Sequence, residues 1–114
     1  MKFRAGRVVD AYAAGGEAHL HALLDQDAGA CRLGEAALGC NYAIDRPLGH
    51  PLIDEKIGGT FHLALGLALR PSEGRHRSAA HCDLIGDLRP GGRVEADGQV
   101  ISENGRFLQS HWPL

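Results

Sequence analysis

Residues 58–66 read Gly-Gly-Thr-Phe-His-Leu-Ala-Leu-Gly, and residues 79–86 read Ala-Ala-His-Cys-Asp-Leu-Ile-Gly. Each run is short and apolar, as a buried strand is, and each carries a histidine, at His62 and His81. Side chains alternate between the two faces of a strand, so His81 and Asp83 are expected to point the same way. If His62 lies on a neighbouring strand, the three polar groups can converge on one point. We therefore expect a central strand over 60–69 and a further strand over 79–86.

The composition predicts a globular protein with one domain over residues 1–114 and a single core. The formal net charge is −2 and no stretch is strongly basic, which argues against binding to nucleic acid or to a membrane surface. No apolar run approaches the roughly 20 residues that span a bilayer, and the first residues are too polar for a signal peptide. The three cysteines include no C-x-x-C pair, so we expect reduced thiols in a cytoplasmic protein.

Helical and extended patterns alternate along the chain. Leucines at positions 20, 23 and 24 have helical spacing and predict the main helix over 17–25. Asp-Gly at 97–98 and Asn-Gly at 104–105 are hairpin signals. The other expected elements are a strand–turn–strand over 2–13, a short helical piece over 27–32 with Asp27 as its N-cap, a strand over 34–40, a loop over 41–51, and strands over 93–96 and 99–102. This order predicts an α+β fold with a mixed, mostly antiparallel sheet and one main helix.

Four side chains in the apolar runs are candidate metal ligands. Zinc and similar ions bind histidine nitrogen and carboxylate oxygen together, which fits Glu35, His62, His81 and Asp83 as one set. Each member also has a simpler interpretation. Glu35 can lie on an edge strand with its carboxylate in water, and a histidine in an apolar strand can be a hydrogen-bonded core residue. His19 and His21, two apart on the main helix, do not share a face and are expected to be surface or packing residues.

Other polar segments have two interpretations that the residues leave open. Asp54 and Glu55 are either part of a solvated turn or carboxylates close to the histidines that follow. The arginines of the loop over 70–78 either meet an anionic substrate group or are solvated. Trp112 is a candidate for docking the C-terminal tail.

Taken together, the motifs resemble the C-terminal part of the metallo-aminopeptidases typified by aminopeptidase T and aminopeptidase S. The resemblance covers almost the whole chain, in order, and its motifs are specific as a set. They are Gly-Arg-Val-Val-Asp at 6–10, Asp-x-Gly-Ala-x-x-Leu-Gly-Glu at 27–35, Gly-x-Asn at 39–41, Asp-Glu-Lys-x-x-Gly-Thr-x-His-x-Ala-x-Gly at 54–66 and Ser-x-x-His-x-Asp at 78–83.

The resemblance implies a metal-dependent hydrolysis of N-terminal peptide bonds. By position, Glu35, His62, His81 and Asp83 match ligands of one or two divalent ions, with zinc or cobalt expected, and Glu55 is the nearest candidate for a general base. The position of the family tyrosine falls on Leu69, and the resemblance also implies a further ligand glutamate in an N-terminal domain, upstream of the region that matches this chain.

The resemblance therefore predicts a peptide substrate, and a homodimer or a separate N-terminal domain as partner. The alternative is a non-catalytic metal-binding or dimerisation domain with structural histidines.

Overall fold

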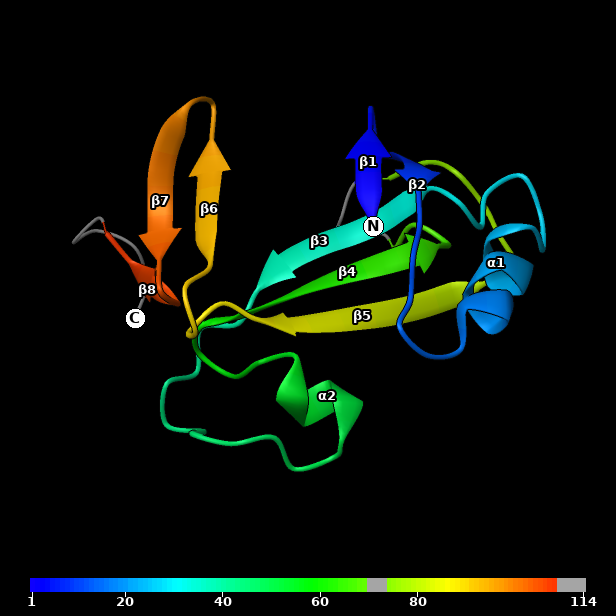
Figure 1. The fold of residues 1–114 in the computed structure, drawn as a ribbon. Coiled ribbons are helices and arrows are strands. Elements are labelled where there is room, and N and C mark those ends of the chain that lie inside the picture. Colours follow the sequence, from blue (N-terminus) through cyan, green and yellow to red (C-terminus); the bar gives the residue numbers. More distant parts are fainter. Residues whose placement is uncertain (70–73, 109–114) are drawn as a thin grey trace. The chain divides into compact units, whose positions relative to one another are not determined.

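The computed structural model describes residues 1–69 and 74–108, and its strands form three sheets. The strands are β1 (Lys2–Arg4), β2 (Arg7–Asp10), β3 (Leu33–Leu38), β4 (Thr60–Gly66), β5 (His81–Asp87), β6 (Arg93–Ala96), β7 (Gln99–Glu103) and β8 (Arg106–Phe107), and the helices are α1 (Glu17–Leu24) and α2 (Pro51–Asp54). Figure 1 shows the strand orders β1-β2, β3-β4-β5 and β6-β7-β8. The predicted α+β class is confirmed.

The chain divides into two compact units. The first contains Met1–Ala36 and Leu63–Leu84, and the second contains Ala37–His62 and Ile85–Leu114. Arg70, whose surroundings the sequence left open, and Trp112, the candidate for docking the tail, lie outside the described residues. None of the helices in the described part of the chain is long and apolar enough to cross a membrane.

In the first unit, β1 and β2 form a hairpin that also pairs with residues 31–33, where β3 begins. Val8 N donates to the Cys31 carbonyl at 2.8 Å, and Leu33 N donates to the Gly6 carbonyl at 2.7 Å. The buried apolar residues of this unit are Leu24, Ala30, Ala64, Leu65 and Ala80. Most of these residues are alanines. Their small side chains let the helix and the strands approach closely, so that the core is filled by close packing of the backbone.

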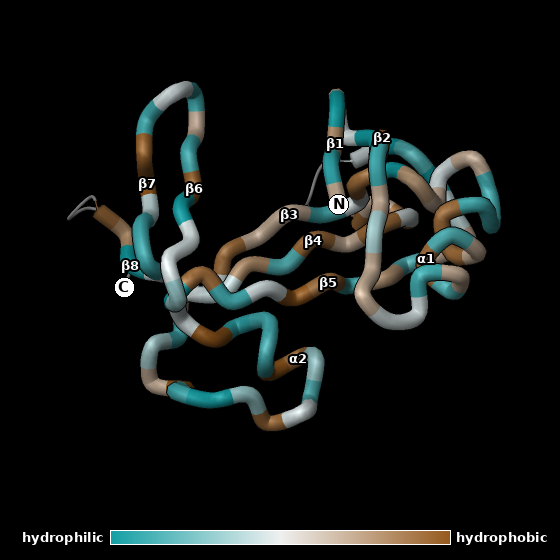
Figure 2. Tube along the Cα trace, in the orientation of Figure 1, coloured by the Kyte–Doolittle hydropathy of each residue, from teal (hydrophilic) through white to brown (hydrophobic). Residues whose placement is uncertain are grey.

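The second unit contains α2 and the β6-β7-β8 sheet. Ile57 and Ile101 are buried there, with Thr60 and Ser102 as buried polar neighbours in the same unit. The Tyr42 hydroxyl donates to the Gly105 carbonyl at 2.8 Å, and this hydrogen bond fixes the turn between β7 and β8. Along the tube in Figure 2, hydrophobic colouring also reaches α2, where Leu52 remains 69% exposed.

Three two-residue turns connect neighbouring antiparallel strands, and each has positive φ at both of its residues. They are Ala5–Gly6 (47° and 71°), Asp97–Gly98 (51° and 78°) and Asn104–Gly105 (50° and 75°). This is the type I′ geometry, which matches the twist of the flanking strands and favours Asn-Gly and Asp-Gly. The two hairpins predicted at 97–98 and 104–105 are therefore confirmed, and Ala5 is the residue whose side chain suits its turn least.

Replacing Ala5 with asparagine is expected to stabilise the protein by roughly 0.5–1 kcal/mol. The left-handed conformation costs an alanine about 1–2 kcal/mol, and asparagine tolerates it better because its side chain bonds locally. Urea unfolding followed by circular dichroism measures the change. Ala18→Asn is the matched control, because Ala18 lies in α1 and asparagine is a poorer helix former than alanine. Stabilisation by both substitutions, or by neither, would contradict this explanation.

The main helix is confirmed as α1, but the predicted helix over 27–32 is wrong. Residues 28–31 form turns, and Arg32 makes an isolated antiparallel bridge with Arg7 before β3 begins. Asp27 Oδ1 accepts hydrogen bonds from the backbone N–H groups of Gly29 and Ala30, at 2.8 and 2.9 Å. The cap interaction thus forms without a helix, because a side chain that binds the nearby backbone competes with helical hydrogen bonding.

Candidate metal centre

The four predicted ligands lie on the three strands of one sheet. Glu35 is in β3, His62 is in the middle strand β4, and His81 and Asp83 are the first and third residues of β5. Glu35 is half-buried, and the side chains of His81 and Asp83 are each 30% exposed. These three residues belong to the first unit. His62 belongs to the second unit and is only 3% exposed.

The structure brings His81 and Asp83 together, as the two-residue strand period predicts. His81 Nε2 lies 3.7 Å from Asp83 Oδ1. Two bonds to zinc of about 2.1 Å each can span about 4.2 Å, so both atoms can reach a single ion. One imidazole nitrogen and one carboxylate oxygen are also suitable donors for a divalent metal. The pair therefore supplies two donors that suit a divalent ion.

The remaining predicted ligands are not gathered around this pair. Within residues 1–69 and 74–108, no group of three or more histidine, cysteine, aspartate or glutamate side chains is placed to hold a metal ion. Glu35 and His62 each make an interaction in the structure, so neither side chain is without a partner. Their role as ligands stays a prediction.

The sequence left open whether Asp54 and Glu55 belong to a solvated turn or to the site. In the structure the two carboxylates make different contacts. The Asp54 carboxylate accepts hydrogen bonds from the backbone N–H groups of residues 48, 49 and 50, at 2.7, 2.9 and 3.2 Å. Asp54 therefore holds the loop that leads into α2. Glu55 follows α2, and its Oε1 lies 2.6 Å from Lys56 Nζ, with the glutamate side chain 12% exposed and the lysine 60% exposed. The role of Glu55 as general base stays a prediction, and in this structure its carboxylate is paired with Lys56.

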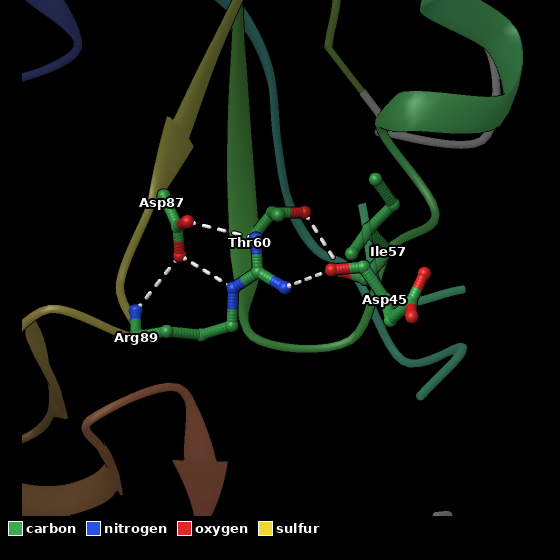
Figure 3. Close-up of polar contacts among 5 residues, drawn as sticks. All are labelled: Asp45, Ile57, Thr60, Asp87 and Arg89. Carbon is green, nitrogen blue, oxygen red and sulfur yellow. Dashed lines mark hydrogen bonds and ion pairs between the residues drawn. The ribbon is translucent and has the colours of Figure 1, made fainter. Parts of the chain in front are cut away.

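A second polar cluster in the second unit fixes the start of the same loop (Figure 3). Arg89 Nε and Nη2 donate to the two oxygens of Asp87 at 2.9 and 2.8 Å, and Nη1 donates to the Asp45 carbonyl at 2.9 Å. This paired hydrogen bonding from Arg89 lowers the pKa of Asp87 below its ordinary value. Thr60 Oγ1 donates to the Ile57 carbonyl at 2.8 Å nearby. These contacts hold both ends of the segment that carries Glu55.

A further carboxylate, Asp27, joins two of the sequence motifs within the first unit. Besides the local bonds of its Oδ1, Asp27 Oδ2 accepts from Ser78 Oγ at 3.0 Å and from Ala79 N at 2.8 Å. These donors lower the pKa of Asp27, with the Ala79 N–H as the largest cause. The residues appear in motifs 27–35 and 78–83, but sequence reasoning assigned Asp27 only a helix cap. Asp27 fixes the segment just before His81.

Replacing Asp27 with asparagine is expected to lower the melting temperature by roughly 5 °C at neutral pH. The amide has one oxygen and one NH₂ group, so it cannot accept from all four donors. Because the folded pKa is lowered, the stabilisation is present above the ordinary carboxyl pKa and is lost as pH falls below about 4. Melting curves between pH 7 and pH 3 should therefore converge for the two proteins. Asp25→Asn is the control, and an equal pH-dependent gap for both variants would contradict the role of Asp27.

The position that the family tyrosine would occupy carries Leu69, which follows the end of β4. Its side chain is 38% exposed. A leucine side chain has no hydrogen-bond donor or acceptor, so Leu69 cannot make the hydrogen bond or the metal contact that a tyrosine hydroxyl could make.

The comparison with known proteins is consistent with these motifs. The family model described as thermophilic metalloprotease (M29) matches residues 1–107. No curated protein and no solved structure matches the chain.

Proposed function

The chain belongs to the thermophilic metalloprotease (M29) family, and we propose on that premise that it is a metallo-aminopeptidase-like domain. A metalloprotease family implies a divalent metal and a peptide substrate. The observation that best supports the proposal in this chain is the His81–Asp83 pair, two donors on one strand at 3.7 Å. Its reaction would be hydrolysis of the N-terminal peptide bond, with zinc or cobalt as one or two bound ions.

The proposed ligands are Glu35, His62, His81 and Asp83. The order of motifs in the sequence and the mixture of nitrogen and oxygen donors support this set. Within the first unit, Glu35, His81 and Asp83 lie on strands of one sheet, which also supports it. When bound, a divalent ion supplies Lewis-acid polarisation of the scissile carbonyl and activation of a water molecule.

Glu55 is the proposed general base. A carboxylate takes a proton from the attacking water and returns it to the leaving amine, which needs a base held at a fixed position. The hydrogen bonds of Asp54 to residues 48–50 and of Arg89 to the Asp45 carbonyl hold the segment that precedes Glu55. These contacts support a defined position for Glu55.

We further propose that the protein works in the cytoplasm, as a homodimer or together with a separate N-terminal domain. Three free cysteines, at 31, 40 and 82, are consistent with a reducing compartment. Sedimentation equilibrium of the purified chain distinguishes a dimer from a monomer.

The test of function is metal content followed by turnover. The full chain is dialysed against zinc or cobalt, its metal is measured by plasma mass spectrometry, and hydrolysis of leucine p-nitroanilide is followed. Bound metal with turnover supports the aminopeptidase proposal, and Glu55→Gln should then lower kcat with the metal content unchanged. Bound metal without turnover favours the non-catalytic metal-binding alternative. Absence of bound metal would overturn the proposal.

A further inference from the structure

The two ring nitrogens of His81 lie in different surroundings. Nδ1 is 3.2 Å from the main-chain carbonyl oxygen of Leu67, within hydrogen-bond distance. Nε2 is 3.7 Å from Asp83 Oδ1, which is too long for a direct hydrogen bond. A carbonyl oxygen can only accept, so the ring nitrogen that faces it must carry the proton. In a neutral imidazole the other nitrogen, Nε2, then has its lone pair free.

We infer that the Leu67 carbonyl is a positioning group that holds His81 as the Nδ1–H tautomer and directs its Nε2 lone pair to the side where Asp83 lies. The inference rests on the proposed function, because it assigns Nε2 as the metal-binding atom. Histidine ligands of metals usually donate their second ring N–H to a carboxylate or a backbone carbonyl, which fixes both tautomer and ring orientation. Leu67 would supply this acceptor from the main chain.

The Leu67 carbonyl that His81 meets lies one residue beyond the end of β4, at Gly66. Its own peptide is anchored, since Leu67 N donates to the Ala80 carbonyl at 2.8 Å. The preceding residue is held twice. Gly66 N donates to the Arg32 carbonyl at 2.8 Å, and His76 Nε2 lies 2.6 Å from the Gly66 carbonyl, to which it donates. The peptides on either side of this acceptor are thus anchored by hydrogen bonds with Arg32, His76 and Ala80 of the first unit.

Gly66 gives this turn its shape. Its φ of +96° lies in a region that side chains rarely adopt, and a Cβ there would lie 2.1 Å from the Ala80 carbonyl oxygen. The chain can therefore leave β4, turn, and present the next carbonyl towards the start of β5, where His81 lies.

The test is the tautomer of His81 in the metal-free full chain, read from nitrogen-15 correlations of the imidazole ring at alkaline pH. We expect the Nδ1–H signature for His81. His21 is the internal control, because its Nε2 also has a carboxylate at a similar distance, 3.5 Å to Glu17 Oε1, and it should show the Nε2–H form. In Asp83→Asn the His81 signature should be unchanged, because the carbonyl sets it. An Nε2–H signature for His81, or a change of tautomer in Asp83→Asn, would overturn the inference.

Addition of zinc separates this inference from the proposed function. We expect zinc to shift the His81 Nε2 resonance and to leave Nδ1 protonated. Zinc that binds through Nδ1 overturns the positioning role while the metal site stands. An Nδ1–H tautomer in a chain that binds no zinc supports the fixed ring and overturns the proposed function instead.

Discussion

Replacing Gly66 with alanine is expected to lower the free energy of unfolding by about 3–5 kcal/mol, enough to unfold much of a marginally stable small protein. Two effects add. A residue with a side chain is strained at a φ of +96°, at a cost of about 1–3 kcal/mol, and the new Cβ would lie 2.1 Å from the Ala80 carbonyl oxygen. That neighbour is backbone, so relief of the overlap requires β4 and β5 to move apart. Urea unfolding followed by far-ultraviolet circular dichroism measures the loss.

Gly98→Ala separates the two effects. Gly98 also has positive φ, +78°, but a Cβ there would meet nothing within 4 Å. Its substitution should cost only about 1–2 kcal/mol, the conformational part alone. If both variants lose the same stability, the close approach of Gly66 to Ala80 is not what requires a glycine at this position.

Features set by neighbouring residues could be predicted from the sequence. The turns at Asp97–Gly98 and Asn104–Gly105 and the helix Glu17–Leu24 depend on local φ preferences and helical spacing, and they appear where expected. The pairing of His81 with Asp83 is equally local, because it needs only a strand and a spacing of two. This is why the spacing of residues was enough to place half of the predicted ligand set together.

Features set by distant residues could not be predicted in this way. Asp27 has the sequence position of a helix cap, yet its second oxygen accepts from Ser78, 51 residues further along the chain. The local pattern over 27–32 contains no sign of that partner, so it suggested a helix where turns occur. The hydrogen bond from His81 to the Leu67 carbonyl is similar. Every residue has a main-chain carbonyl, so the sequence does not indicate which of them accepts from His81.

These distant contacts change how the motifs are understood. Asp27 and Ser78 belong to different motifs, and their hydrogen bond brings the two motifs together near the start of β5. Gly66 ends the motif that contains His62 and shapes the turn that meets His81. Several motif residues, such as Asp27 and Gly66, therefore have structural roles. The motifs of this chain contain the proposed ligands and also residues that hold the strands carrying them.

Replacing His81 with alanine is expected to weaken zinc binding by on the order of 100-fold or more. Loss of an outer-shell partner alone typically costs 10–100-fold, and this substitution removes a proposed ligand itself. The zinc-free variant should remain folded, because the His81 side chain is 30% exposed and its loss leaves no large cavity. Isothermal titration gives the affinity. A second readout is the rise in melting temperature that zinc causes in the parent chain, which the variant should largely lose.

The control for this substitution is His19→Ala. His19 is an exposed histidine in α1, so its loss removes one imidazole without touching β5. Zinc affinity and the zinc-dependent rise in melting temperature should match those of the parent chain. Because surface histidines bind zinc weakly wherever they occur, an equal loss in both variants would mean that binding is diffuse. Unchanged zinc binding in His81→Ala alone would remove His81 from the ligand set, and with it the strongest support that the structure offers for a metal centre.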